Sequence, residues 1–199
     1  MRSCICRPVG PADHIFNNPR RDPRDMSMRV RRATAADADL LALVGAATFL
    51  EAFIDEIPGR AIAAHCARHH AAQSYRGHFE ADSRAAAWIA EHDTTAAPVG
   101  YALLTTPDAT VRPQPGDIEL KRIYVFSRFH ATGLAQRLMD AAIAHAGETG
   151  APRLLLGTYG GNHRAIGFYR RNGFLQTGER QFRVGAEVFD DIIMARTVS

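Results

Sequence analysis

The sequence has few cysteines, no long apolar run and little excess of charge, and each lack excludes a class of protein. Its 199 residues include three cysteines, an odd number without zinc-site spacing, which argues against a disulfide scaffold and fits a reducing compartment. The longest apolar stretch, residues 40–50, is too short to cross a membrane. Proline and charged residues interrupt the N-terminal segment, so no secretory signal peptide is indicated. We therefore expect a cytoplasmic protein without a membrane partner.

The charge is divided unevenly along the chain. Residues 1–27 hold five of the 24 basic and three of the 21 acidic residues, and they lack apolar periodicity. This composition predicts a disordered basic leader. The remainder, 28–199, carries 19 basic and 18 acidic side chains and is long enough for one compact domain. Because this single domain is nearly neutral, no nucleic-acid partner is expected.

The apolar periodicity predicts strands that alternate with helices. A strand is expected at residues 28–32, a helix after Thr34 and a second helix after Pro58. Further strands are predicted at 85–91, 99–105, 117–125, 153–156, 174–182 and 188–195, and further helices at 133–146 and 162–172. The order β-α-α-β-β-β-α-β-α-β-β indicates a mixed α/β architecture, in which strands 85–91 and 99–105 form a hairpin.

The segment 125–138, VFSRFHATGLAQRL, runs from a predicted strand into a predicted helix through small residues. Such a junction presents unpaired backbone N–H groups and the positive end of the helix dipole to an anion. Gly133 would let a phosphate approach the backbone closely. The alternative is a plain structural junction, since many of them contain glycine. The candidate anion-binding residues are His130, Ala131, Thr132, Gly133, Leu134 and Ala135.

A second segment, 154–174, LLLGTYGGNHRAIGFYRRNGF, follows in the chain. Together the two segments resemble the acyl-CoA motifs of the GNAT superfamily of N-acetyltransferases, Gln/Arg-x-x-Gly-x-Gly/Ala and Asn-x-x-Ala-x-x-Phe-Tyr-x-x-x-Gly-Phe. Three positions depart from that pattern: Ser127 replaces Pro, His130 replaces Gln/Arg and Ala131 replaces Gly. The resemblance spans about residues 28–199. The segments 178–182 and 190–194, together with Thr48, Phe49 and Phe53, are similar to the bacterial spermidine/spermine acetyltransferase branch.

This resemblance implies a GNAT-like fold, with a central twisted mixed sheet whose fourth and fifth strands splay apart, and acetyl-CoA as cosubstrate. It implies that Ile123, Tyr124 and Val125 line the pantetheine arm, where a backbone N–H polarises the carbonyl. Asn162 is expected to cap a helix and to bind pantetheine, two compatible roles. Tyr169 lies about two helical turns later on the same side. As a phenol it can protonate the leaving thiolate, and its alternative is a core aromatic.

A general base must deprotonate the acceptor amine, since an alkylammonium is mostly charged at neutral pH. Glu119 stands where the histone-acetylating branch carries its catalytic glutamate, so the resemblance makes it a candidate base acting through water. Its alternative is a solvent-facing strand carboxylate. The motifs place no Cys or Ser beside a base, so direct attack by the amine is expected instead of an acetyl-enzyme.

The acceptor implied by the resemblance is a small primary amine, and the branch that the chain is similar to indicates a polyamine. Glu51, Asp55 and Glu56 are the candidate anchors for its distant charge, and their alternative is a solvated acidic helix end. Acetylation of a protein lysine or N-terminal amine, and a non-catalytic module that senses acetyl-CoA or polyamine, remain alternatives. His65 and His69 lack a carboxylate partner at metal-site spacing, so no metal is expected. The patterns leave monomer and homodimer equally open.

Overall fold

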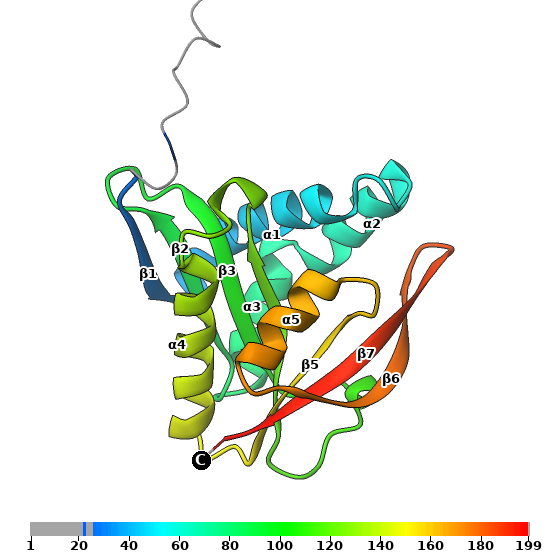
Figure 1. Ribbon diagram of the computed structural model, residues 1–199. Helices are drawn as coiled ribbons and strands as arrows, with labels where there is room; N and C mark the ends of the chain where they lie inside the picture. Colours follow the sequence, from blue (N-terminus) through cyan, green and yellow to red (C-terminus); the bar gives the residue numbers. More distant parts are fainter. Residues whose placement is uncertain (1–21, 23–25, 199) are drawn as a thin grey trace, which may run out of the picture.

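A computed structural model describes residue 22 and residues 26–198, which build one seven-stranded sheet with helices on both faces (Figure 1). The strands are β1 (Met28–Ala33), β2 (Ala86–His92), β3 (Pro98–Thr105), β4 (Ile118–Val125), β5 (Arg153–Tyr159), β6 (Leu175–Val184) and β7 (Glu187–Thr197). Their order across the sheet is β1-β2-β3-β4-β5-β7-β6. In the described chain β4 and β5 pair in parallel and the other neighbours pair antiparallel, so the sheet is mixed, as expected.

The helices form a layer on each side of this sheet. The helices are α1 (Ala38–Phe53), α2 (Gly59–His69), α3 (Ala72–Ala81), α4 (Leu134–Glu148) and α5 (His163–Arg171). Buried side chains of α1 and α3 pack on one face of β2 and β3, while those of α4 and α5 pack on the other face of the sheet. None of the helices in the described part of the chain is long and apolar enough to cross a membrane.

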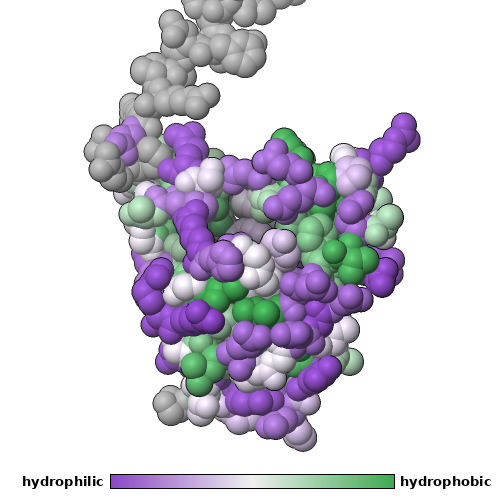
Figure 2. All heavy atoms as spheres, turned by 45° about the vertical axis from the view of Figure 1, so that its right-hand side comes forward, coloured by the Kyte–Doolittle hydropathy of each residue, from purple (hydrophilic) through white to green (hydrophobic). Residues whose placement is uncertain are grey.

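Strands β4 and β5 pair over a short length and then diverge. They pair only at Ile118 with Leu154 and at Glu119 with Leu155, although both strands run on. The expected splay is confirmed. We call the opening between Leu120–Val125 of β4 and Leu156–Tyr159 of β5 the wedge. A space-filling view shows a hollow in the upper part of the molecule (Figure 2), the end toward which β4 and β5 diverge (Figure 1).

A bulge in β4 changes which side chains face the helices α1–α3. Leu104 pairs with Leu120 and Leu103 pairs with Arg122, so Lys121 has no partner in β3. A bulge adds one residue to a strand and bends it. Lys121 and Arg122 therefore follow each other on the same face, between Leu120 and Ile123, which pack on the α4 side.

The predicted order of elements is confirmed with one addition, the helix α3 between the second predicted helix and β2. The predicted hairpin is also confirmed, because β2 and β3 are antiparallel neighbours. The predicted leader, residues 1–27, lies outside the described residues except for positions 22, 26 and 27. Met26 packs against the core of the domain, and Ser27 bonds Asp93 at the end of the hairpin.

Candidate functional site

The predicted anion-binding loop connects the open end of β4 to α4. Ala131 and Gly133 both have left-handed backbones, with φ of 63° and 82°. The first helical bond of α4 runs from Arg137 N to Gly133 O, so the amides of Leu134 and Ala135 have no helical carbonyl to bond. A Cβ added to Gly133 would meet no atom within 4 Å. The loop therefore presents free donors beside open space, as an anion site requires.

Two side chains hold this loop in shape. The Nε2 atom of His130 lies 3.0 Å from Val125 O, and the Thr132 hydroxyl donates to Phe129 O at 2.6 Å. Burial and the nearby Arg164 lower the pKa of His130, so its ring is neutral at pH 7 and donates to that carbonyl. His130 thus ties the loop back to β4, and the free backbone amides are the groups that remain for an anion.

Asn162 and Tyr169 stand on one side of α5. The Asn162 side chain accepts a bond from Ala165 N at 3.0 Å, so it caps the helix as expected. This bond uses the Oδ1 atom and leaves the amide nitrogen without a partner among the described residues. Asn162 therefore retains two N–H donors for a ligand, and the capping role does not exclude the binding role.

Tyr169 is a largely buried phenol whose hydroxyl has no partner in the described chain. It is 9% exposed, and its ring packs beside Phe168 and Phe174. The buried side-chain atoms that lack a hydrogen bond are Glu91 Oε2, Arg122 Nη1 and Arg196 Nε. The Tyr169 hydroxyl is not among them, so it reaches accessible space. Burial, and next the Tyr124 phenol, raise its pKa well above 10, so Tyr169 keeps its proton.

Glu119 lies at the apex of the wedge, in the last pair that joins β4 to β5. It is 2% exposed, which excludes the solvent-facing alternative. Its Oε2 atom accepts a bond from Asp108 N at 2.9 Å and lies 3.6 Å from Lys121 Nζ. Arg180 Nη1 lies 4.0 Å from the other oxygen. These contacts by themselves explain the burial of Glu119, and its role as a base stays a prediction.

A second buried carboxylate, which the sequence patterns did not single out, lies near Glu119. Asp191 on β7 is 6% exposed and binds Arg180 Nε at 3.2 Å. Burial raises the pKa of Asp191, and the arginine opposes this shift. The Arg180 guanidinium covers Gly157 of β5 so closely that a Cβ there would overlap it. Arg180 thus links Glu119 and Asp191 across the α1–α3 side of the wedge.

The three predicted acceptor anchors lie at and after the end of α1. Glu51 is already engaged, because its carboxylate accepts bonds from Ser127 N at 2.9 Å and from the Ser127 hydroxyl at 2.8 Å. It joins α1 to the start of the predicted anion loop. The side chains of Asp55 and Glu56 are exposed, and their carboxylates make no hydrogen bond or ion pair with the described residues. Glu51 is thus engaged by the protein itself, whereas the other two carboxylates are not, and the anchoring role of the three stays a prediction.

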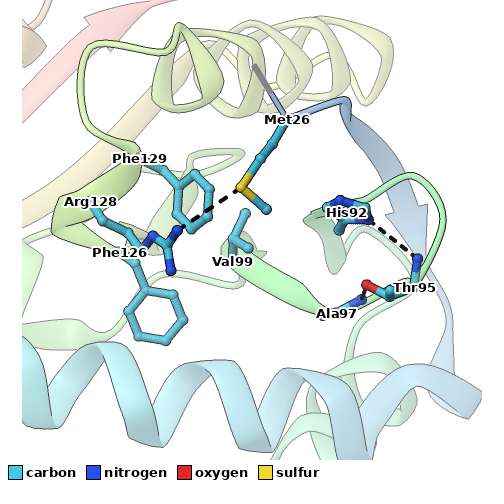
Figure 3. A pocket seen from close by; sticks show the side chains of 8 residues that line it. All are labelled: Met26, His92, Thr95, Ala97, Val99, Phe126, Arg128 and Phe129. Carbon is cyan, nitrogen blue, oxygen red and sulfur yellow. Dashed lines mark hydrogen bonds between the residues drawn. The ribbon is translucent and has the colours of Figure 1, made fainter. Parts of the chain in front are cut away.

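A separate pocket of about 370 Å³ lies between the β2–β3 loop and the turn after β4 (Figure 3). Its lining residues are Met26, His92, Thr95, Ala97, Val99, Phe126, Arg128 and Phe129. The side chain of Arg128 points to the sulfur of Met26, and Phe129 lies behind them (Figure 3). None of the predicted cofactor, catalytic or acceptor residues lines this pocket, so it is distinct from the wedge.

Three comparisons with known proteins bear on this site. The model of the Acetyltransferase (GNAT) family matches residues 50–174. An uncharacterized N-acetyltransferase of Mycobacterium bovis and one of Mycobacterium tuberculosis are each 36% identical to this chain over 160 residues, 80% of this chain and 97% of theirs.

Among solved structures, PaiA N-acetyltransferase from Thermoplasma acidophilum in complex with coenzyme A has a TM-score of 0.68 at 16% identity, covering 86% of this chain and 99% of its own. The putative acetyltransferase YncA of Salmonella typhimurium with acetyl-CoA has a TM-score of 0.66 at 17% identity, covering 87% and 95%. At these identities the two structures support the fold.

Proposed function

The chain belongs to the acetyltransferase (GNAT) family of acetyl-CoA-dependent N-acetyltransferases, and from that premise we propose that the wedge transfers the acetyl group to a primary amine by direct attack. The proposal rests on how three features are arranged around the wedge. The strands part after Glu119 and Leu155, and amides at the start of α4 stand at the open end without a helical carbonyl to bond. Within the part of the chain that the structure describes, the Tyr169 hydroxyl has no hydrogen-bond partner either. The wedge therefore offers a phosphate seat, a path for pantetheine and a proton donor in one place.

The cofactor roles proposed on this basis fall to a few neighbouring segments. The amides of residues 133–135 bind the pyrophosphate, with Ala131 and His130 shaping the loop. Ile123, Tyr124 and Val125 line the pantetheine arm on the unpaired edge of β4, and Asn162 donates to it from α5. The open space above Gly133 supports this assignment, because a phosphate needs close access to the backbone.

The proposed reaction proceeds without a covalent enzyme intermediate. The amine nitrogen forms a bond to the carbonyl carbon of the thioester while the carbon–sulfur bond breaks. The proton lost by the nitrogen passes to a base, and the Tyr169 proton passes to the thiolate. A buried phenol that remains protonated suits this last step.

Glu119 and Asp191 are the two candidate bases on the acceptor side. Glu119 is flanked by Lys121 and Arg180, whereas burial raises the pKa of Asp191 and so favours its uptake of a proton near neutral pH. The burial of Asp191 and the direction of its pKa shift thus support for Asp191 the base role that the sequence resemblance assigned to Glu119.

The polyamine hypothesis rests on Asp55 and Glu56, which are exposed and free to meet a distant cation. Glu51 supports it less, because Ser127 already occupies both of its carboxylate oxygens. Charged side chains that lie fully in solvent bind a cation weakly. The acceptor is therefore proposed here only as a small primary amine, with spermidine as one member of the set to be tested.

The proposed function is tested by measuring free-thiol release from acetyl-CoA in the presence of cationic, neutral and anionic primary amines. We expect release that depends on an amine and yields the N-acetyl product. If acetyl-CoA stabilises the protein and no amine is acetylated, the non-catalytic sensing alternative replaces the transferase mechanism. If a protein lysine is acetylated and the free amines are not, the acceptor is a protein.

A further inference from the structure

Arg122 is a cation on the acceptor side of β4, and no carboxylate of the described residues pairs with it. It directly precedes the segment 123–125 that we propose to line the pantetheine, and the bulge turns it toward α3. The central carbon of its guanidinium lies 5.3 Å from the centre of the Tyr75 ring. Its Nη1 atom is buried and has no hydrogen-bond partner among the described residues. Unpaired buried donors are uncommon in folded proteins and call for an explanation.

No carboxylate among the described residues forms an ion pair with Arg122, and the side chains around it on α2 and α3 are neutral or basic. Four of them are histidines from α2, its C-terminal end and α3, namely His65, His69, His70 and His78. Burial lowers the pKa of each histidine, and the charges that add to this effect are cationic in every case, with Arg122 contributing to all four. Lys121 lies on the same face of β4 as Arg122, and the carboxylate that it contacts, Glu119, also lies 4.0 Å from Arg180.

The histidines cannot balance the charge of Arg122, because an imidazole ring is either neutral or positively charged, and the lowered pKa values keep these rings mostly neutral at pH 7. His65 instead stacks on Phe49 with ring centres 4.3 Å apart, as an ordinary aromatic would. Within residues 22 and 26–198, no set of three His, Cys, Asp or Glu side chains is placed to hold a metal ion. The recess is therefore suited to an anion, and a guanidinium binds a carboxylate or phosphate through two parallel hydrogen bonds.

We infer that the acceptor amine carries an anionic group, a carboxylate or a phosphate, which pairs with Arg122 while the amine faces the thioester. This inference rests on the proposed function, since it names the acceptor class of the same wedge. It requires an acceptor of opposite charge to spermidine. The position of Arg122, one residue before the pantetheine segment, would hold the anion close to the reacting carbonyl.

The test compares acceptors with and without an anionic group. Phenylalanine and phenethylamine share a primary amine and a phenyl ring, and only the first has a carboxylate. O-Phosphoethanolamine supplies a phosphate, and spermidine supplies further cations. We expect kcat/KM for phenylalanine or O-phosphoethanolamine to exceed that for phenethylamine and spermidine by at least about tenfold. Which of the two anionic acceptors is better identifies the anion.

Variants of Arg122 tie the preference to this side chain. Arg122→Gln should reduce the ratio of anionic to neutral kcat/KM by about tenfold or more, and Arg122→Lys should keep part of it. Arg60→Gln, the same change at an exposed position of α2, should leave the ratio unchanged. The wild-type ratio decides the matter even where Arg122→Gln does not fold.

The outcomes separate the inference from the proposed function. Turnover with phenethylamine or spermidine as the best acceptor overturns the anionic class and leaves the transferase intact. Absence of acetyl transfer to every amine overturns the proposed function itself. An anion preference that survives in folded Arg122→Gln removes Arg122 as its source.

Discussion

The two sides of the wedge present different chemical groups to a ligand. On the cofactor side, one continuous run, 123–135, and the helix α5 offer backbone amides, a glycine and two neutral side chains. On the acceptor side, Arg122 and Glu119 of β4, Arg180 of β6 and Asp191 of β7 are ionisable groups from three separate strands. Backbone amides recognise a phosphate whatever the side chains are, whereas ionisable side chains can be changed one at a time. The cofactor side is thus suited to a constant cosubstrate and the acceptor side to a variable one.

The largest expected effect comes from Tyr169, which serves both sides. Tyr169→Phe removes only the hydroxyl, so kcat should fall by about 10²- to 10⁴-fold while acetyl-CoA affinity stays close to that of the wild type. Steady-state kinetics together with a thermal shift by acetyl-CoA measure the two quantities. A Tyr169→Phe rate within twofold of wild type would remove the acid role.

The next largest effect should be a loss of stabilisation by acetyl-CoA, confined to the cofactor side. A ligand that binds only the folded state stabilises it by about 2.7 kcal/mol at a hundredfold excess over its dissociation constant, roughly 5–10 °C for a chain of this size. Gly133→Glu should abolish that shift, because its carboxylate would occupy and repel the phosphate seat. The variant alone should also lose roughly 1–2 kcal/mol of stability, since its φ of 82° is unfavourable for glutamate.

Gly77→Glu provides the control for this experiment. Its position in α3 has open space around a new Cβ, so the same charge change is made far from the loop. We expect its acetyl-CoA shift to equal that of the wild type. A folded Gly133→Glu protein with an undiminished shift would contradict the pyrophosphate assignment.

Much of the fold was predictable because its elements bury strongly periodic side chains. Strands β2 and β3 are buried on both faces and read as nearly continuous apolar runs. The helix α3 was not predicted, since Tyr75 is its one buried residue. Its start at Ala71 has no capping side chain, and no glycine or proline separates it from α2. Contact with α1 and the sheet, not local sequence, specifies this helix.

The candidate site likewise combines residues that local sequence signals indicate with residues that only the fold brings together. Asn162 and Gly133 could be identified because capping and a left-handed turn leave local signals in the sequence. Ala131 adopts a left-handed backbone without being a glycine, which no local preference indicates. Arg122 left one signal: apolar and charged residues alternate from Ile118 to Lys121, and Arg122 breaks this alternation as the extra residue of a bulge does. The pairing of Asp191 with Arg180 left none, because it depends on the register of β6 and β7.

The smallest effect should be a rise in the acceptor KM, confined to the acceptor side. Gly157 faces that side, since its neighbour Leu156 packs toward α4 and α5, and the Arg180 guanidinium fills the space above it. Gly157→Ala should displace this guanidinium from Asp191 and Glu119. We expect the acceptor KM to rise by about two- to tenfold, which corresponds to roughly 0.5–1.4 kcal/mol for one partly buried ion pair. The acetyl-CoA thermal shift should not change.

Gly178→Ala on β6 is the matched control, because the new Cβ would be in ordinary contact with Ile193 at 3.5 Å. Both variants add one methyl group to a strand, but only Gly157→Ala moves Arg180. Equal acceptor KM values in the two variants would show that Arg180 does not shape acceptor binding. A weaker acetyl-CoA shift in Gly157→Ala would show that the two sides of the wedge are coupled, because the methyl group lies on the face away from α5.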